Sequence, residues 1–209
     1  MFNQGPKGYI FTTNGYREVE YPKGYNGSFD DPLSLKILHE EADIVCTNPP
    51  FSRAIDYWDT LIKSGKKFII ISNITNPITK AFIPYFKNDR VWAGFNEVDW
   101  FLNPKRELTR AAGHWYTNFP IKNRHKHELL KIMPLKRIPE RCKKYDDSKI
   151  LLVDNGYIPS DYKKPFAVSA RPILNGLLEM GYKIIEENES YIAFVNGKQC
   201  FRRVLVKRV

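Results

Sequence analysis

Apolar runs of strand length alternate with a helical pattern in the first half of the chain. Residues 43–47 and 67–73 each contain a continuous β-branched or apolar run, of the kind that is buried on both faces of a parallel sheet. Between them, apolar side chains recur at helical spacing over residues 52–64, and the pattern stops at Gly65. Strand, helix and strand in this order predict a βαβ unit, whose right-handed crossover places both strand ends at one edge of the sheet.

Shorter patterns predict the remaining elements. Helices are expected over residues 34–41, 79–86 and 128–132. Strands are expected over residues 9–12, 90–95, 113–118, 182–186, 191–195 and 199–207. The stretch 96–112, in which Asn, Lys and Arg surround two aromatic residues, is predicted to be an exposed loop. Asn196-Gly197 separates the last two strands and is a strong signal for a β-hairpin.

The tetrapeptide Asn48-Pro49-Pro50-Phe51 directly follows the first strand of the βαβ unit, and Ser52 is a candidate N-cap of the next helix. Open α/β sheets bind their ligands at this end of a strand. The prolines fix φ and donate no backbone hydrogen bond, which stiffens the loop and leaves carbonyl oxygens for a ligand. Asn48 offers an amide and Phe51 a flat apolar face, so the loop suits a planar base with an amino group. The alternative is a plain strand-to-helix turn.

Positive charge is concentrated in one segment. The chain of 209 residues has a net charge of +10. Residues 122–144 hold nine lysines and arginines against two glutamates, a density that suits phosphate contacts along DNA. A solvated basic surface is the alternative. The candidate DNA contacts in this segment are Lys122, Arg124, Lys126, Arg137, Arg141, Lys143 and Lys144.

Several other features narrow the class of protein. Cys46, Cys142 and Cys200 are widely spaced and form no CxxC pair, which indicates reduced thiols in a cytoplasmic protein and no metal site. The chain contains neither a leader signature nor an apolar run of about 18 residues, so we predict no membrane association. His114 stands between Gly and Trp in a predicted strand, where a hydrogen-bonded sheet histidine is favoured over a catalytic base.

The motif at Asn48–Phe51 resembles the catalytic motif of amino-directed methyltransferases that use S-adenosylmethionine. The order of motifs along the chain resembles, more narrowly, the EcoRI-type adenine-specific modification methylases, from about residue 27 to the C-terminus. These motifs lie at residues 43–52, 67–73, 77–94, 115–118, 159–162, 165–172 and 195–198. The resemblance implies a Rossmann-like α/β fold whose mixed, mostly parallel sheet carries helices on both faces. It also implies methyl transfer to the adenine amino group of double-stranded DNA in a restriction-modification system, with the base flipped out.

The resemblance also implies roles for individual residues. Asn48, Pro49, Pro50 and Phe51 would form the pocket for the target base. Ser28, Phe29 and Asp30 would contact the adenine ring of the cofactor, although relatives carry an Asp at the position of Ser28. An Asx-type turn that caps the following helix is the equal alternative for this turn. Relatives are longer at the N-terminus, where their main cofactor segment lies, and no glycine-rich loop follows a strand within residues 1–47. We therefore expect the fold to be incomplete at the N-terminus.

The organisation expected from these patterns is a single domain, residues 1–209. It comprises a catalytic α/β core at 27–118, a basic DNA-contacting extension at 119–165 and a C-terminal β-rich part at 166–209. Three functions stay open. The first is an adenine-specific DNA methyltransferase, which acts alone or with a second chain that supplies the cofactor segment. The second is a non-catalytic DNA-binding remnant or half of a split enzyme. The third is an RNA amino-methyltransferase. The basic segment argues against a protein substrate.

Overall fold

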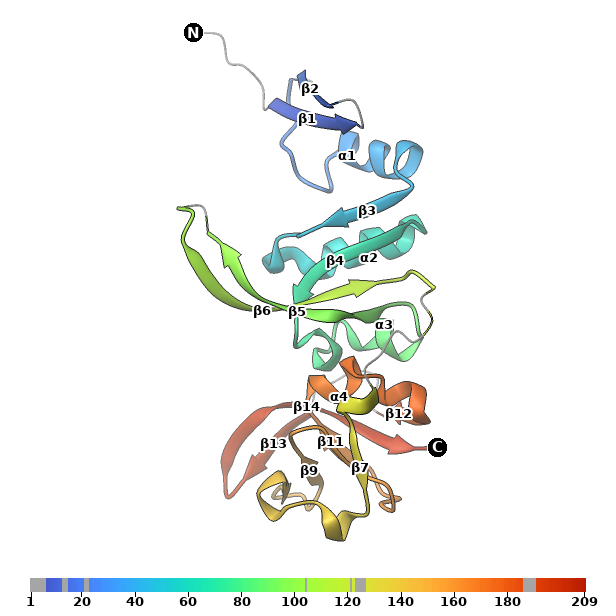
Figure 1. Ribbon diagram of the computed structural model, residues 1–209, viewed down its shortest axis with the longest axis vertical. Coiled ribbons are helices and arrows are strands. Elements are labelled where there is room, and N and C mark those ends of the chain that lie inside the picture. The colour runs from blue at the N-terminus through green and yellow to red at the C-terminus, as the bar shows by residue number, and fades with distance from the viewer. Residues whose placement is uncertain are drawn as a thin grey trace.

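The computed structural model describes residues 7–12, 15–20, 23–103, 105–120, 122, 127–185 and 191–209. Its elements are arranged along one long axis (Figure 1). At one end, β1 (Lys7–Thr12) and β2 (Gly15–Glu20) form an antiparallel hairpin, which confirms the strand predicted over 9–12. A four-stranded sheet with its helices, here called the α/β unit, occupies the middle, and a β-rich C-terminal unit follows.

The α/β unit contains the predicted βαβ arrangement. Its strands are β3 (Ile44–Thr47), β4 (Lys67–Asn73), β5 (Trp92–Leu102) and β6 (Leu108–Thr117), in the sheet order β3-β4-β6-β5. Its helices are α1 (Pro32–Lys36), which continues into the π-helix η1 (Ile37–Glu41), and α2 (Ala54–Ser64) and α3 (Ile83–Lys87). β3 and β4 are parallel, and α2 ends at Gly65 in the left-handed conformation, as the pattern predicts.

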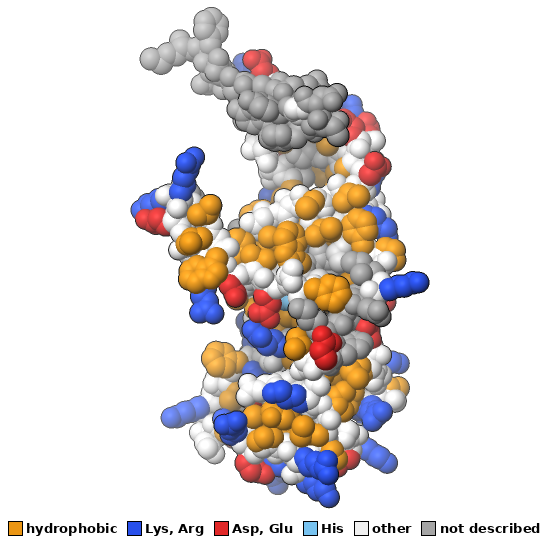
Figure 2. Space-filling view, viewed as in Figure 1, with side chains coloured by type: hydrophobic (Ala, Val, Ile, Leu, Met, Phe, Trp, Pro, Cys, Tyr) orange, Lys and Arg blue, Asp and Glu red, His pale blue; other side chains and the backbone are white. Residues whose placement is uncertain are grey.

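The helices α2 and α3 cover one face of this sheet. The ring of Trp58 on α2 is fully buried and lies 5.1 Å from the ring of Tyr116 on β6 and 5.9 Å from that of Phe86 on α3, between centroids. On β4 the buried side chains alternate with exposed ones. Ile44 and Ile69, on the opposite face, are 54% and 37% exposed, and Figure 2 shows hydrophobic side chains gathered over this part of the molecule. The expectation of a strand buried on both faces, between two helical layers, is therefore not met in the described residues.

Residues 96–112 do not form the predicted loop. Residues 96–102 and 108–112 belong to β5 and β6, which form a long antiparallel hairpin. Its outer part, here called the hairpin arm (residues 97–103 and 105–113), curves away from the sheet in Figure 1. Two register shifts in the β5–β6 pairing break the strict alternation of side chains, and this obscures the strand pattern in the sequence. Gly113 lets the arm bend closely, because a Cβ there would lie 3.0 Å from both the Phe101 ring and the Val98 carbonyl oxygen.

The C-terminal unit is built on one long strand. β14 (Lys198–Arg208) pairs with β13 (Tyr191–Val195) in its first half and with β11 (Phe166–Val168) and β12 (Tyr182–Ile184) in its second half. β9 (Leu151–Val153) and β8 (Lys143–Tyr145) extend the sheet beyond β11. β7 (Lys131–Met133) and β10 (Tyr157–Pro159) form a separate parallel pair. Strands from 119–165 and from 166–209 thus share one sheet, and the Asn196-Gly197 hairpin is confirmed.

Short helices differ from the predicted ones in their bounds. The stretch 79–86 is helical only from Ile83, because Pro84 has a fixed φ and no N–H group and so starts a helix better than it continues one. Residues 128–132 are not a helix: the 3₁₀ turn η4 (His127–Leu129) leads into β7. Further 3₁₀ turns are η2 (Phe51–Arg53), η3 (Asn76–Ile78), η5 (Leu135–Arg137), η6 (Glu140–Cys142) and η7 (Leu177–Met180), and α4 (Ala170–Leu174) precedes η7.

The sheets are mixed, and antiparallel pairing prevails. Three of the ten pairings among the described strands are parallel and seven antiparallel, so the predicted mostly parallel sheet is not confirmed. The short connection between β5 and β6 makes their pairing antiparallel, since a parallel pair needs a long crossover. One core of buried side chains nevertheless runs continuously from Ala54 in the α/β unit to Val206 in the C-terminal unit.

No helix among the described residues is long and apolar enough to cross a membrane. The same part of the chain holds no group of three or more His, Cys, Asp or Glu side chains arranged to bind a metal ion. Cys46, Cys142 and Cys200 are free thiols.

Candidate functional site

The Asn48–Phe51 loop begins where β3 ends, at the edge of the α/β unit. Pro49 is buried and anchors the loop, whereas Asn48 and Pro50 are exposed and Phe51 is 37% exposed. Among the described residues, the Asn48 side chain makes no hydrogen bond, so its amide is available to a ligand. The Pro50 carbonyl oxygen accepts from the Arg53 amide at 3.0 Å. That bond closes the 3₁₀ turn η2 (Phe51–Arg53), and Ser52 therefore lies inside the turn and is not the predicted N-cap.

The Phe51 ring meets the base of the hairpin arm. Its centroid lies 6.2 Å from that of Phe101 on β5, and the two ring planes are nearly perpendicular, at 85°. This edge-to-face contact fixes the orientation of Phe51 while leaving part of the ring exposed. Phe101 was not a candidate in the sequence because 96–112 carried no regular strand pattern. The aromatic pair Trp100-Phe101 shortly before the dipeptide Asn103-Pro104, a sequence typical of turns, is the signal that could have indicated a hairpin.

The end of β4 is fixed by hydrogen bonds at the same edge of the sheet. The Asn73 side-chain oxygen accepts from the Thr75 amide at 2.8 Å and from its hydroxyl at 2.7 Å, and the Asn73 carbonyl accepts from the Tyr116 hydroxyl at 2.8 Å. Burial raises the pKa of Tyr116 well above its usual value, so that the hydroxyl stays a donor. His114 is buried in β6, with its Nδ1 3.0 Å from the Trp115 carbonyl oxygen, as expected of a sheet histidine.

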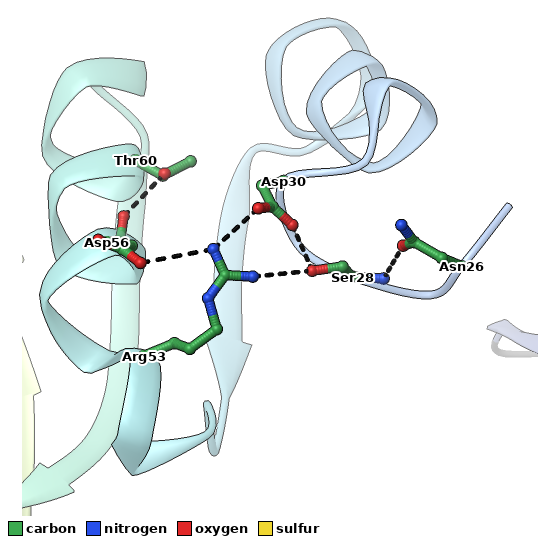
Figure 3. Close-up of polar contacts among 6 residues, drawn as sticks. All are labelled: Asn26, Ser28, Asp30, Arg53, Asp56 and Thr60. Atoms are coloured by element: carbon green, nitrogen blue, oxygen red, sulfur yellow. Dashed lines mark hydrogen bonds and ion pairs between the residues drawn. The ribbon is translucent and has the colours of Figure 1, made fainter.

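Arg53 joins the turn before α1 to the loop that follows β3 (Figure 3). Its guanidinium donates to Asp30 at 2.8 Å, to Ser28 at 3.3 Å and, more weakly, to Asp56 at 3.4 Å. The Ser28 hydroxyl in turn donates to the other carboxylate oxygen of Asp30. The Arg53 guanidinium also lies 4.6 Å from the centroid of the Phe29 ring, within cation–π range. The turn predicted to contact a cofactor is thereby tied to the Asn48–Phe51 loop.

The hydrogen bonds of this cluster stabilise the ionised form of Asp30. The bond from Arg53, followed by that from Ser28, holds the pKa of the Asp30 carboxyl well below its usual range. The hydrogen bond to Asp30 in turn raises the pKa of Arg53. Asp31 performs the other role considered for this turn, because its side chain accepts from the Leu33 amide at 2.9 Å and caps α1.

Replacing Arg53 with alanine is expected to raise the pKa of Asp30 towards the ordinary carboxyl value of about 3.9. In the wild type the pKa of Asp30 is lowered on folding. The stabilisation by this ion pair is therefore complete above the ordinary carboxyl pKa and is lost as the pH falls towards the lowered one. NMR titration of the Asp30 side chain measures the change. Arg90→Ala, remote from the cluster, should leave the curve unaltered; an unchanged Asp30 pKa in Arg53→Ala would contradict the assignment.

A cavity of about 370 Å³ adjoins the Phe29 ring. Phe29 packs edge-to-face on Tyr57 of α2, with 4.8 Å between centroids, and Leu38, Val45 and Leu61 also line the cavity. Its apolar walls and modest size suit one flat aromatic group, such as an adenine ring. Ser28 and Asp30 lie beside it but already bond to Arg53.

The residues predicted to contact DNA differ in their exposure to solvent. Lys122, Arg137, Arg141 and Lys144 are exposed. Lys143 is only 13% exposed, forms an ion pair with Glu140 at 2.7 Å and donates to the Leu135 carbonyl oxygen, and it is therefore the least accessible of the described candidates. The remaining candidates, Arg124 and Lys126, lie outside the described residues.

Comparison with known proteins gives one family and several relatives. The family model described as adenine-specific methyltransferase EcoRI matches residues 13–208. The type II methyltransferase M.EcoRI of Escherichia coli is 29% identical over 212 residues, which cover 87% of this chain and 62% of the relative. The type II methyltransferase M.MgeORF184P of Mycoplasma genitalium is 32% identical over 253 residues, with coverage of 99% and 77%. No solved structure matches the chain.

Proposed function

This chain belongs to the family of the adenine-specific methyltransferase EcoRI, and we propose that it transfers a methyl group from S-adenosylmethionine to the exocyclic amino group of adenine in DNA. The observation that carries the proposal is the Asn48–Phe51 loop at the carboxyl end of β3, with an accessible Asn48 amide beside a partly exposed Phe51 ring. The chain spans 62% of the length of M.EcoRI, so the activity of the whole relative is carried over here as a proposal.

In this proposal the residues of the loop have different roles in binding the target base. The Asn48 side-chain oxygen and the Pro49 carbonyl oxygen accept the two amino hydrogens of a flipped adenine, and the Phe51 ring stacks on the base. Accepting both hydrogens directs the nitrogen lone pair away from the ring plane, towards the methyl donor. Positioning and electrostatics then suffice, without a strong base. When bound, the cofactor supplies the activated methyl group, and Phe29 with the adjoining cavity would hold its adenine ring.

A Rossmann-like arrangement in one domain is part of the proposal. The parallel β3–α2–β4 unit supplies the parallel portion of such a sheet, and the continuous core supports a single domain that includes the C-terminal unit. Double-stranded DNA in the cytoplasm, in a restriction-modification system, is the proposed substrate. The exposed basic residues Lys122, Arg137, Arg141 and Lys144 would contact its phosphates.

A second candidate function is half of a split methyltransferase. The cavity beside Phe29 suits the adenine ring, but the described residues around it include no glycine-rich loop for the methionine part of the cofactor. In this alternative a second chain supplies that part, and the present chain binds DNA without methylating it alone.

Calorimetric titration of S-adenosylmethionine into the 209-residue chain, followed by transfer of a tritiated methyl group to duplex DNA, tests the proposal. Micromolar cofactor binding and adenine-directed transfer are expected. A chain that binds DNA but neither binds the cofactor nor transfers the methyl group would overturn the autonomous enzyme in favour of the split one. Preferential methylation of an RNA oligonucleotide with the same adenines would instead indicate an RNA amino-methyltransferase.

The affinity for DNA is expected to fall steeply with salt. The logarithm of the binding constant should decrease with the logarithm of salt concentration by roughly 0.9 for each phosphate contacted. Replacing both Arg141 and Lys144 with glutamine should therefore reduce this slope by about 2. Fluorescence anisotropy of a labelled duplex at several salt concentrations gives the slope. Lys36→Gln with Lys63→Gln removes equal charge from the α/β unit, and an equal loss of slope in that control would contradict the placement of the interface.

A further inference from the structure

Phe201 is presented to solvent by an irregularity in β14. In the pairing of β13 with β14, Ile192 lies opposite Arg202 and Phe194 opposite Gln199. One β13 residue, Ala193, therefore faces two β14 residues, Cys200 and Phe201. This is the arrangement of a β-bulge, which redirects a side chain out of the regular alternation. The Phe201 ring is 85% exposed as a result. A phenylalanine left in water loses the free energy of apolar burial, which indicates a role outside the core.

The bulge is held in place by a buried arginine. Arg203 is only 8% exposed, and its guanidinium donates to the Phe201 carbonyl oxygen at 3.1 Å and to the Arg202 carbonyl oxygen at 3.2 Å. It also forms an ion pair with Asp154 at 2.8 Å. A second polar atom of the same side chain, Nε, is buried without a partner among the described residues. Arg203 thus holds the backbone of Phe201 and Arg202 in place. The side chains of these two residues are therefore already positioned before a ligand binds.

Basic side chains from three elements surround Phe201. A cavity of about 670 Å³ is lined by Phe201 and Arg202 of β14, Arg171 of α4 and Arg110 of the hairpin arm. Glu97 and Asp99 also line it, and Arg171 forms an ion pair with Glu97 at 3.1 Å. With Arg203 included, the cationic side chains of the lining outnumber the acidic ones, and Figure 2 shows basic side chains spread over the C-terminal unit.

A second cavity continues this surface. It measures about 590 Å³ and shares Phe201 and Arg203 with the first cavity. Lys144 of the basic segment and Asp154, the ion-pair partner of Arg203, also line it. Phe201 therefore lines two adjoining cavities. Their combined lining holds five cationic side chains against three carboxylates: Arg110, Lys144, Arg171, Arg202 and Arg203 against Glu97, Asp99 and Asp154. Phosphate groups suit the arginines, whereas the exposed ring suits an apolar planar partner. Nucleic acid offers both, since its bases have stacking faces and its backbone carries charge.

We propose that Phe201 is a wedge that inserts its ring between stacked base pairs of the bound DNA, while Arg110, Arg171 and Arg202 contact the adjoining phosphates. Apolar side chains that enter a base step partly unstack it and kink the duplex. A wedge of this kind lowers the cost of extruding a nearby base. The inference rests on the proposed function, because it assumes that DNA is the substrate.

Duplex binding by the 209-residue chain and its Phe201→Ala variant tests the wedge. Fluorescence anisotropy should show affinity about tenfold weaker in Phe201→Ala, with an unchanged salt slope because no charge is lost. Arg202→Gln should instead reduce the slope by about 1. A 2-aminopurine probe next to the bound step should brighten with the wild type and with Phe201→Trp, but much less with Phe201→Ala. Phe194→Ala on β13, where the ring is 46% exposed, is the matched control, and thermal melts confirm that each variant folds.

The outcomes separate this inference from the proposed function. If the wild type binds and methylates DNA while Phe201→Ala matches Phe194→Ala in affinity and probe fluorescence, the wedge is overturned and the proposed function stands. If the wild type does not bind duplex DNA at all, both are overturned. A loss of affinity in Phe201→Ala without any brightening by the wild type would replace the wedge by a simple surface contact, and would also overturn it.

Discussion

Replacing Asn48 with alanine is expected to lower methyl transfer to adenine by at least about a hundredfold. The substitution removes the accessible amide at the end of β3, and with it one of the two oxygens proposed to accept the amino hydrogens of the base. Because Asn48 makes no hydrogen bond to the described residues, its loss should barely change the stability of the protein. The expected deficit is therefore in catalysis and base binding.

Initial rates of tritiated methyl transfer to duplex DNA provide the measurement for Asn48→Ala, with the chain and cofactor in excess. If a second chain is needed for activity, the assay is made with the completed complex. The matched control is Asn88→Ala, an exposed asparagine that follows α3, remote from the loop. Full activity in Asn48→Ala, or an equal loss in both variants, would be incompatible with the proposed role.

The second large effect is expected on stability, from Trp58→Ala. Trp58 is fully buried where the α2 and α3 helices meet the sheet, and its ring lies 4.8 Å from that of Phe82 and 5.7 Å from that of Tyr85, between centroids. Truncating such a side chain loses apolar burial and leaves a cavity. The free energy of unfolding should fall by about 3–5 kcal/mol.

Urea unfolding followed by circular dichroism measures this difference between Trp58→Ala and the wild type. Trp100→Ala is the matched control, because Trp100 lies on the hairpin arm and is 60% exposed. Its midpoint should lie close to that of the wild type. A loss for Trp58→Ala that is no larger than for Trp100→Ala would show that α2 does not anchor the α/β unit as described.

The parts of the fold that follow from local pattern could be predicted from the sequence. The strand-helix-strand unit over residues 43–73 carries its own signals, namely apolar runs, helical spacing and a terminating Gly65. Asn196-Gly197 specifies its turn because both residues adopt positive φ, at 53° and 71°. The hairpin arm could not be predicted in the same way, since its register shifts remove the alternation on which strand prediction depends.

In the candidate site, too, the residues that are contiguous in sequence could be predicted, whereas those that depend on tertiary contacts could not. The Asn48–Phe51 loop is contiguous in sequence, and its position after a strand is sufficient to nominate it. Arg53 and Phe101, by contrast, contact residues that are distant in the chain. Arg53 reaches Asp30 across 23 positions, and the exposure of Phe201 depends on a mismatch between two strands. Such tertiary contacts leave no periodic trace in a single sequence.

The pairing of β14 with three earlier strands has a consequence for folding during synthesis. Every strand pairing of the α/β unit is complete once Thr117 has been made. By contrast, β11, β12 and β13 must wait for residues 198–208 before they can pair with β14. Until then their apolar side chains and unpaired edges face the solvent, a state prone to aggregation. We expect the nascent chain to acquire its first sheet early and to need chaperones most until residues 198–208 have been translated.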